Sequence, residues 1–246
     1  MVRYPDVSLL IQGPITAENF GWTKIPLDMF GEVIISTWDK DAANILHSDW
    51  KVVHQPFDID PALDLQYNIG RQTLTVLKGL RACTKPYVLK HRTDEYYSNL
   101  DVLVDKFYET GCKKWVCAPV VFGAPSYTKF HAADHLYIAP RDRLIKTFVQ
   151  TMGDLYHGTY EKNYNGEPAA EVQYTTRFLN VGGYEIIGRY HAELMKENYD
   201  IVPLEALMPF SIKIGTKGFN FTTPEEVYND MEYLRDVKTV EELMRR

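Results

Sequence analysis

Short apolar runs closed by turn signals divide the beginning of the chain into strands. The first run spans residues 7–11 and ends at Gly13-Pro14. Similar runs occupy residues 33–37 and 51–54. Compact apolar runs bounded by Gly and Pro are typical of strands buried in a sheet.

A helical pattern and a further strand follow these runs. Residues 65–82 carry apolar side chains at 69, 76, 77 and 80, which is a helical spacing, and Pro86 stops the helix. A β-rich segment at 87–93 follows at once. This order of strand, helix and strand predicts an α/β fold with a mostly parallel sheet flanked by helices on both faces.

The second half is less regular. Its pattern predicts two strands and two helices, at residues 115–122, 135–139, 141–152 and 168–179. Residues 154–167 are polar and contain Tyr156, Tyr160 and Tyr164, which we interpret as a loop. No linker-like segment separates the halves, so we predict one domain over residues 1–246.

Composition mainly excludes classes of protein. The chain has 246 residues and a net charge of −6, which disfavours a broad nucleic-acid surface. Its longest apolar runs fall far short of the roughly 18–20 residues of a membrane span. The three cysteines form no CxxC pair, and no signal-peptide core opens the chain, so we expect a cytoplasmic protein.

One charged strand carries most of the chemical information. Lys90, Arg92 and Asp94 alternate along the 87–93 strand and should share a face at the carboxyl edge of the sheet. Asp94 can hold a divalent cation, and the two basic residues can neutralise a diphosphate. A surface ladder of salt bridges is the alternative, but it fits a central strand poorly.

Three other polar motifs fall at the same predicted edge. They are Gln12-Gly13-Pro14 after the first strand, Thr37-Trp38 after the second, and Asn68, Arg71 and Gln72 on one helix face. Each has an ordinary structural explanation: a Gly-Pro turn, a strand end with a core tryptophan, and a solvated helix face. Their common location favours a nucleotide site.

Acidic residues in the second half are candidates for metal binding or catalysis. Asp134 and His135 precede a strand and can hold a metal ion, contact substrate or play a structural part. Glu171 opens a helix, where the helix dipole favours a carboxylate whatever its role.

The chain carries five motifs in order: Leu-Leu-Ile-Gln-Gly-Pro-Ile, Ile-Ser-Thr-Trp, Asn-Ile-Gly-Arg-Gln, Tyr-Val-Leu-Lys-His-Arg-Thr-Asp and Asp-His-Leu-Tyr. Taken together, these motifs resemble the WavE lipopolysaccharide-synthesis family of glycosyltransferases over roughly residues 7–180. The resemblance implies a GT-A-like fold, a nucleotide at the first strand and turn, and an aspartate motif for the metal ion and sugar diphosphate. Here Arg92-Thr93-Asp94 replaces the common Asp-x-Asp pattern, which puts metal dependence in question.

We therefore expect sugar transfer from a nucleotide-sugar donor to a hydroxyl of a glycan or sugar acceptor. The nucleotide-binding half would span about residues 1–110 and the acceptor half about residues 111–246. Asp94 and His135 are the candidate ligands of Mn²⁺ or Mg²⁺, and a metal-free reaction assisted by Lys90 and Arg92 is the alternative. Glu171 is the first candidate for the general base and Asp134 the second.

Two other functions are alternatives. A sugar nucleotidyltransferase would typically show a Gly-rich first loop followed by a basic residue, which Gln-Gly-Pro-Ile-Thr lacks. A non-catalytic carbohydrate-binding protein would show aromatic residues without a charged constellation. Lys90, Arg92 and Asp94 argue against it.

Overall fold

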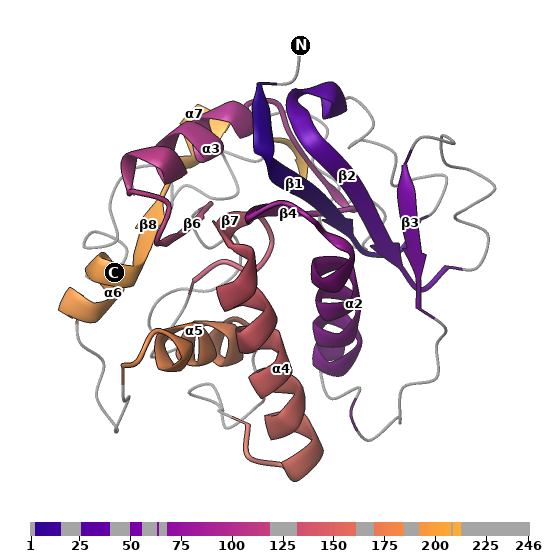
Figure 1. Cartoon of the computed structure of the whole chain (residues 1–246), viewed down its shortest axis with the longest axis vertical. Coiled ribbons are helices and arrows are strands. Elements are labelled where there is room, and N and C mark those ends of the chain that lie inside the picture. Colours follow the sequence, from indigo (N-terminus) through magenta and orange to yellow (C-terminus); the bar gives the residue numbers. More distant parts are fainter. Residues whose placement is uncertain are drawn as a thin grey trace.

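A twisted sheet forms the centre of the molecule in the computed structural model (Figure 1). The structure describes residues 3–15, 26–39, 50–55, 63, 68–118, 132–160, 170–184, 192–207 and 209–212. Within these residues the main sheet has the order β3-β2-β1-β4-β7-β6-β8. Its strands are β1 (Tyr4–Gln12), β2 (Phe30–Thr37), β3 (Lys51–His54), β4 (Tyr87–Arg92), β6 (Trp115–Cys117), β7 (Tyr137–Pro140) and β8 (Tyr199–Ile201).

The direction of β7 decides which residues reach the candidate site. β1 pairs in parallel with β2 and β4, β2 with β3, and β6 with β8, whereas β7 is antiparallel to both of its neighbours. Lys90, near the end of β4, pairs with Tyr137 at the start of β7. The residues just before β7 therefore lie at the edge where the parallel strands end.

Helices cover both faces of this sheet (Figure 1). On one face lie α2 (Ile69–Ala82), α4 (Arg141–His157) and α5 (Ala170–Val181). On the other lie α3 (Leu100–Glu109) and the short α7 (Leu204–Leu207). The α/β class with a mostly parallel sheet is thus confirmed.

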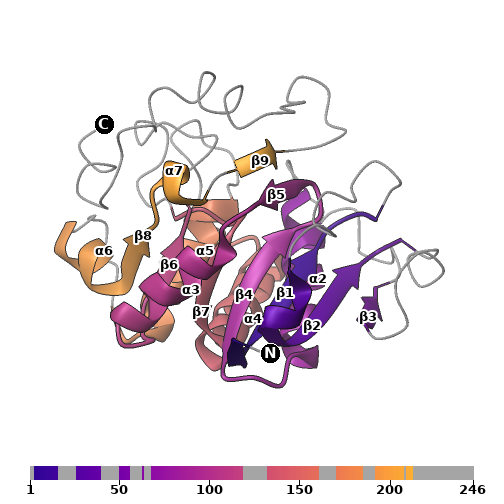
Figure 2. The same ribbon diagram turned by 90° about the horizontal axis from the view of Figure 1, so that it is seen from above.

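Four smaller elements complete the described chain. The single turn η2 (Leu27–Met29) leads into β2, and α6 (Ala192–Asn198) leads into β8. The short strands β5 (Glu95–Tyr97) and β9 (Pro209–Ile212) pair in a second, antiparallel sheet beyond the end of β4 (Figure 2). β5 matters for the site because it starts directly after the turn that closes β4.

Several expected elements have different bounds in the structure. The helix expected at 141–152 continues to His157, because the chain meets no strong breaker before Gly158, which takes the left-handed conformation at φ 66°. The predicted loop at 154–167 is therefore wrong at its start, and Tyr156 is an exposed helical residue. Tyr164 lies outside the described residues.

Other differences are shifts of element ends. The helix expected at 65–82 begins at Ile69, after Asn68 in the left-handed region. The strand expected at 115–122 is seen as β6, and residues 119–122 lie outside the described part of the chain. β4 ends at Arg92, so Asp94 belongs to a turn and not to the strand.

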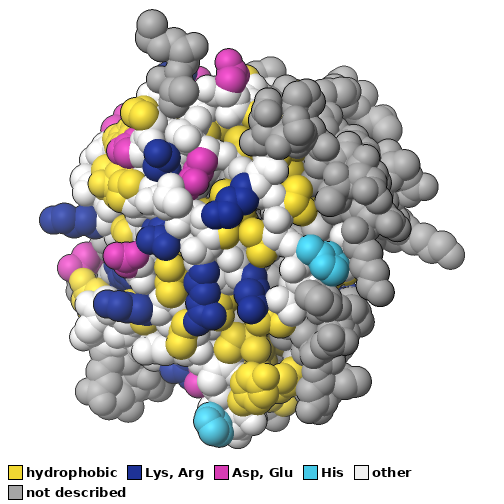
Figure 3. Space-filling model, turned by 45° about the vertical axis from the view of Figure 1, so that its right-hand side comes forward, with side chains coloured by type: hydrophobic (Ala, Val, Ile, Leu, Met, Phe, Trp, Pro, Cys, Tyr) yellow, Lys and Arg dark blue, Asp and Glu magenta, His cyan; other side chains and the backbone are white. Residues whose placement is uncertain are grey.

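Basic side chains gather among apolar ones on the face that Figure 3 presents. Lys51 of β3 and Arg81 of α2 are both exposed. The Lys51 ammonium donates to the Ala82 carbonyl, 2.9 Å away, at the C-terminal end of α2. Cations at that end offset the helix dipole, so these two have a structural explanation. Among the described residues no helix is long and apolar enough to span a membrane.

Candidate functional site

The turn after β4 brings Asp94 back onto Arg92. The Arg92 guanidinium donates through Nε to Asp94 Oδ1 and through Nη2 to Oδ2, each over 2.7 Å. Although burial opposes ionisation, this guanidinium holds the pKa of Asp94 well below its usual range. Both carboxylate oxygens of Asp94 are therefore committed to an ion pair in this structure.

Lys90 ties the strand to the segment before β7. Its side chain is buried, and its Nζ donates to the backbone carbonyl of Asp134 over 2.5 Å and to that of His135 over 3.4 Å. Burial lowers the pKa of Lys90 to about 8, while the Asp134 carboxylate opposes that shift. The ammonium thus fixes the main chain of the two residues expected to bind metal or substrate.

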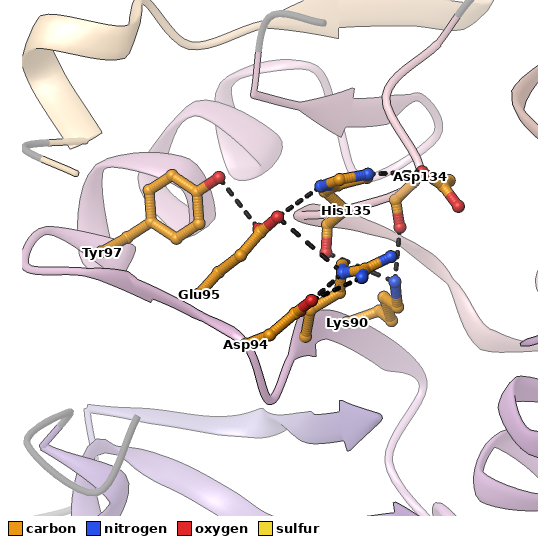
Figure 4. Close-up of polar contacts among 7 residues, drawn as sticks. Lys90, Asp94, Glu95, Tyr97, Asp134 and His135 are labelled. Atoms are coloured by element: carbon orange, nitrogen blue, oxygen red, sulfur yellow. Dashed lines mark hydrogen bonds and ion pairs between the residues drawn. The ribbon is translucent and has the colours of Figure 1, made fainter. Parts of the chain in front are cut away.

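His135 is held between two acidic residues (Figure 4). Its Nδ1 contacts Glu95 Oε1, and its Nε2 lies 3.5 Å from Asp134 Oδ1. The other oxygen of Glu95 accepts a hydrogen bond from the Tyr97 hydroxyl, 3.1 Å away. Glu95 is fully buried, which tends to raise its pKa, yet His135 and Arg92 together lower it. The carboxylate is therefore ionised at neutral pH.

Glu171 completes a set of metal-ligating groups. Ligand atoms of Asp134, His135 and Glu171 all lie within 4.8 Å of one another. Ligands placed about 2.0–2.3 Å from one ion lie roughly 3 to 4.6 Å apart, so this spacing suits a single divalent cation. Two carboxylates with one imidazole suit Mn²⁺ better than Mg²⁺, which prefers oxygen alone. The residues fit the metal ion expected from the sequence.

Charge balance in this cluster also favours a cation. Among the residues that the structure describes, the basic groups of this cluster are Lys90, Arg92 and His135. The carboxylates of Asp94, Glu95, Asp134 and Glu171 outnumber them. Excess negative charge in a buried cluster is costly, and a divalent ion would offset it.

The end of β1 packs against the ends of β2 and β4. The Gly13 amide donates to the Ser36 carbonyl over 3.2 Å, and the Thr93 amide donates to the Gln12 carbonyl over 3.1 Å. Gly13 has φ 141°, and a Cβ at this position would overlap Thr93 Oγ1. The glycine is thus required by close packing at this edge.

Two of the expected nucleotide motifs meet at one contact. Arg71 lies over the Trp38 ring at 5.5 Å, which joins the β2 end to the helix face. Thr37 is buried and accepts from the Asp39 amide over 3.1 Å, while Pro14 is half-buried in the turn after Gly13. Asn68 is exposed at the start of α2, and Gln72 is half-buried one turn later.

A hydrogen bond links the nucleotide side to the acidic side. The hydroxyls of Thr73 on α2 and Tyr174 on α5 lie 2.9 Å apart. Thr73 follows Gln72 directly, and Tyr174 lies one helical turn after Glu171. The helices that carry the two groups of candidate residues are therefore in direct contact.

Sequence reasoning missed Glu95, Tyr97 and Asp39 as parts of this edge. Strict strand alternation assigns Glu95 to the face opposite Asp94, but the turn brings both carboxylates to Arg92. The available signal was a pair of consecutive acidic residues at the end of a buried strand. Asp39 accepts from the Ile15 amide over 2.5 Å and joins the β1 turn to the β2 end, which only the fold reveals.

Comparison with known proteins yields no sequence relative. No protein-family model matches the chain, and no curated protein matches it. The likeness to the WavE family therefore rests on its motifs.

Solved structures do resemble the chain in outline. A 4-diphosphocytidyl-2C-methyl-D-erythritol synthase from Anaerococcus prevotii has 11% identity and a TM-score of 0.45, over 93% of this chain and 96% of that one. Mouse xyloside xylosyltransferase 1 has 9% identity and a TM-score of 0.42, over 80% and 85%. A glucosyl-3-phosphoglycerate synthase from Mycobacterium tuberculosis, solved with Mn²⁺, UDP and phosphoglyceric acid, has 13% identity and a TM-score of 0.40, over 57% of each chain. At these identities and TM-scores the likeness carries no information about substrates.

Proposed function

We propose that this chain is a glycosyltransferase of GT-A-like fold, related to the WavE family. It would move a hexosyl or related sugar from a nucleotide donor to a hydroxyl of a glycan or sugar acceptor. One observation carries the proposal: a buried cluster of opposite charges lies at the carboxyl edge of a parallel sheet, beside the ends of β1 and β2. Open α/β sheets bind ligands at that edge.

The nucleotide would lie along the part of this edge that is formed by the ends of β1 and β2 and the start of α2. Polar and aromatic groups that can contact a base, a ribose and a diphosphate come from the ends of two strands and from the first turns of α2. They are Gln12, Gly13, Pro14, Thr37, Trp38, Asn68, Arg71 and Gln72. Arg92 gives two of its five donors to Asp94, and its remaining donors can meet a phosphate.

The metal ion would lie on the acidic half of the edge. Asp134, His135 and Glu171 can hold it as they stand, whereas Asp94 can join only after Arg92 releases it. A bound Mn²⁺ or Mg²⁺ would supply positive charge for the leaving nucleoside diphosphate. Lys90 and Arg92 would add to that charge, and a metal-free reaction would depend on them alone.

Glu171 remains the first candidate for the general base. It lies in the first turn of α5, is half-buried and can therefore meet an acceptor hydroxyl. Asp134 is buried against His135, which makes it the second candidate. A residue that binds the metal ion is not available as the base, so the two roles of Glu171 exclude each other.

A panel of nucleotide sugars tests the function. We expect slow release of nucleoside diphosphate from one donor, accelerated by its acceptor. Release of pyrophosphate from a nucleoside triphosphate and a sugar phosphate would instead show nucleotidyl transfer. Binding of sugars without any turnover would show a carbohydrate-binding protein.

Substitution at Glu171 tests the base. Glu171→Gln should lower the transfer rate by about 10²–10⁴ while donor and Mn²⁺ affinities stay unchanged. Asp142→Asn is the matched control, because Asp142 is an exposed carboxylate in the first turn of α4. If Glu171→Gln loses Mn²⁺ affinity, Glu171 is a ligand. If it transfers at the wild-type rate and Asp134→Asn is inactive, Asp134 is the base.

The single domain over residues 1–246 is part of the same proposal. The main sheet joins β4 of the first half to β7 of the second, and Lys90 donates to the backbone of both Asp134 and His135. The nucleotide-binding and acceptor halves would therefore share one core.

A further inference from the structure

Glu95 has no role in the scheme above, although it is fully buried and charged. A buried carboxylate is retained at such cost only when its partners satisfy it. Its Oε1 contacts His135 Nδ1, its Oε2 accepts from Tyr97 over 3.1 Å, and Arg92 Nε lies 3.8 Å from Oε1. Each oxygen of Glu95 therefore has a defined partner.

This arrangement determines the tautomer of His135. An ionised carboxylate can only accept hydrogen bonds, so the imidazole nitrogen that faces Glu95 must carry a hydrogen. The other ring nitrogen, Nε2, lies 3.5 Å from Asp134 Oδ1, so it is the nitrogen that faces the carboxylate expected to share the ion.

We propose that Glu95 is a positioning residue: it holds His135 with hydrogen on Nδ1, so that Nε2 binds a divalent cation together with Asp134. This deepens the proposed function, on which it rests for the use of the ion. Metal-binding histidines commonly donate their second N–H to a carboxylate, which fixes the ring and makes it a better ligand.

The main chain of the same ligands is fixed from another direction. Lys90 Nζ donates to the carbonyls of Asp134 and His135, so the ring and the backbone are restrained by different elements. Tyr97 and Glu95 belong to β5, whereas Lys90 belongs to β4. Ligands restrained in this way are organised before the ion arrives, which is the requirement for a precise metal site.

Titration of the full chain with Mn²⁺ alone tests the proposal, with free Mn²⁺ followed by electron paramagnetic resonance. Wild type should bind one ion, and His135→Ala should bind none. Glu95→Ala should bind it about 10–100-fold more weakly, and Glu95→Gln should recover part of the loss, because an amide oxygen still accepts from Nδ1. Glu32→Gln is the control, since Glu32 is a hydrogen-bonded carboxylate that contacts Ser8 and the 84–85 backbone instead.

The tautomer gives a readout that general loss of stability would not mimic. In ¹⁵N-histidine spectra, the signals that disappear in His135→Ala belong to this ring. They should show a protonated Nδ1 in wild type and lose that preference in Glu95→Ala. Tyr97→Phe should weaken Mn²⁺ binding less than Glu95→Ala does, and it keeps the test valid if Glu95 variants fail to fold.

Several outcomes would overturn the inference. They are wild-type affinity in a folded Glu95→Ala variant, the opposite tautomer in wild type, or absence of Mn²⁺ binding by wild type. If Mn²⁺ binds as described but no nucleotide sugar is consumed, the proposed function fails and the inference stands. If donors are consumed in excess EDTA and Mn²⁺ does not bind, only the inference fails.

Discussion

At the scale of single residues, the structure shows an ion pair between Arg92 and Asp94 that the sequence alone did not predict. The sequence predicts Asp94 as a metal ligand, and in the structure its carboxylate accepts two hydrogen bonds from Arg92. Asp94→Asn should therefore lower the free energy of unfolding by roughly 3 kcal/mol, because it leaves a mostly buried guanidinium without its counter-charge.

Denaturation and Mn²⁺ titration of this variant separate the two roles. If the ion pair is the role of Asp94, stability falls and Mn²⁺ affinity is retained. If Asp94 is a ligand, Mn²⁺ affinity is lost. Asp101→Asn is the control, because it breaks an exposed pair with Arg3 and should cost less than about 1 kcal/mol.

His91 makes a prediction about acid stability. It is fully buried, with its ring edge-on to Tyr97 at 5.8 Å, and burial lowers its pKa to about 4 from an ordinary value near 6.5. Between pH 4 and 6.5, His91 is therefore protonated in the unfolded chain and neutral in the folded chain. The contribution of His91 to stability is thus complete above pH 6.5 and is lost as the pH falls towards 4.

Urea denaturation at several pH values checks this. Between pH 6.5 and 4, the free energy of unfolding of the wild type should fall more steeply than that of His91→Phe. The difference should reach up to about 1.4 kcal/mol per pH unit. Phe keeps the ring and removes the titrating group. Parallel pH profiles for the two proteins would contradict the assignment.

At the scale of elements, the close packing of α2 against the sheet depends on one glycine, Gly79. A methyl group on Gly79 would overlap the side chain of Leu10 and approach Ser36 Cβ to 3.0 Å. Leu10 is fully buried, so a shift of its side chain would disturb the packing of the core. Gly79→Ala should therefore destabilise the protein by about 1–3 kcal/mol, in spite of the better helix propensity of alanine.

Gly153 supplies the matched control for this prediction. It lies inside α4, and a methyl group there would meet nothing within 4 Å. Gly153→Ala should stabilise the protein by up to about 1 kcal/mol. Thermal melts of the two variants should shift in opposite directions, and a shared direction would show that close packing at α2 is not decisive.

At the scale of the whole molecule, the sheet runs through both halves of the chain. β4 has β1 on one side and β7 on the other, and the buried Lys90 ammonium is satisfied by carbonyls before β7. A fragment of residues 1–110 would leave that strand edge and that ammonium without partners. We expect it to lack cooperative unfolding, whereas the full chain should unfold in one transition.

Circular dichroism and limited proteolysis of the fragment check this expectation. A fragment with a sharp melt and a protease-resistant core would show two independent domains. The proposed division at about residue 110 would then be a domain boundary.

The sequence by itself determined the architecture and the edge at which to look. Buried strands leave a local pattern of apolar residues in the sequence. This pattern predicted β1, β2 and β4, and it also located the polar residues that follow these strands. Lys90 and Arg92 became candidates because they lie at the end of such an apolar run, and Asp134 and His135 because they directly precede a predicted strand.

Only the tertiary structure decided which charged groups are partners. Glu95 and His135 are 40 residues apart, and they meet because β7 runs antiparallel beside β4 and a turn redirects the chain after Arg92. Pairing energies between charges depend on distances of a few ångströms, whereas side-chain pattern specifies only a face and a period. The turn after Arg92 places Asp94 against Arg92 and Glu95 against His135. This turn has no periodic signature in the sequence, so these pairings are visible only in the tertiary structure.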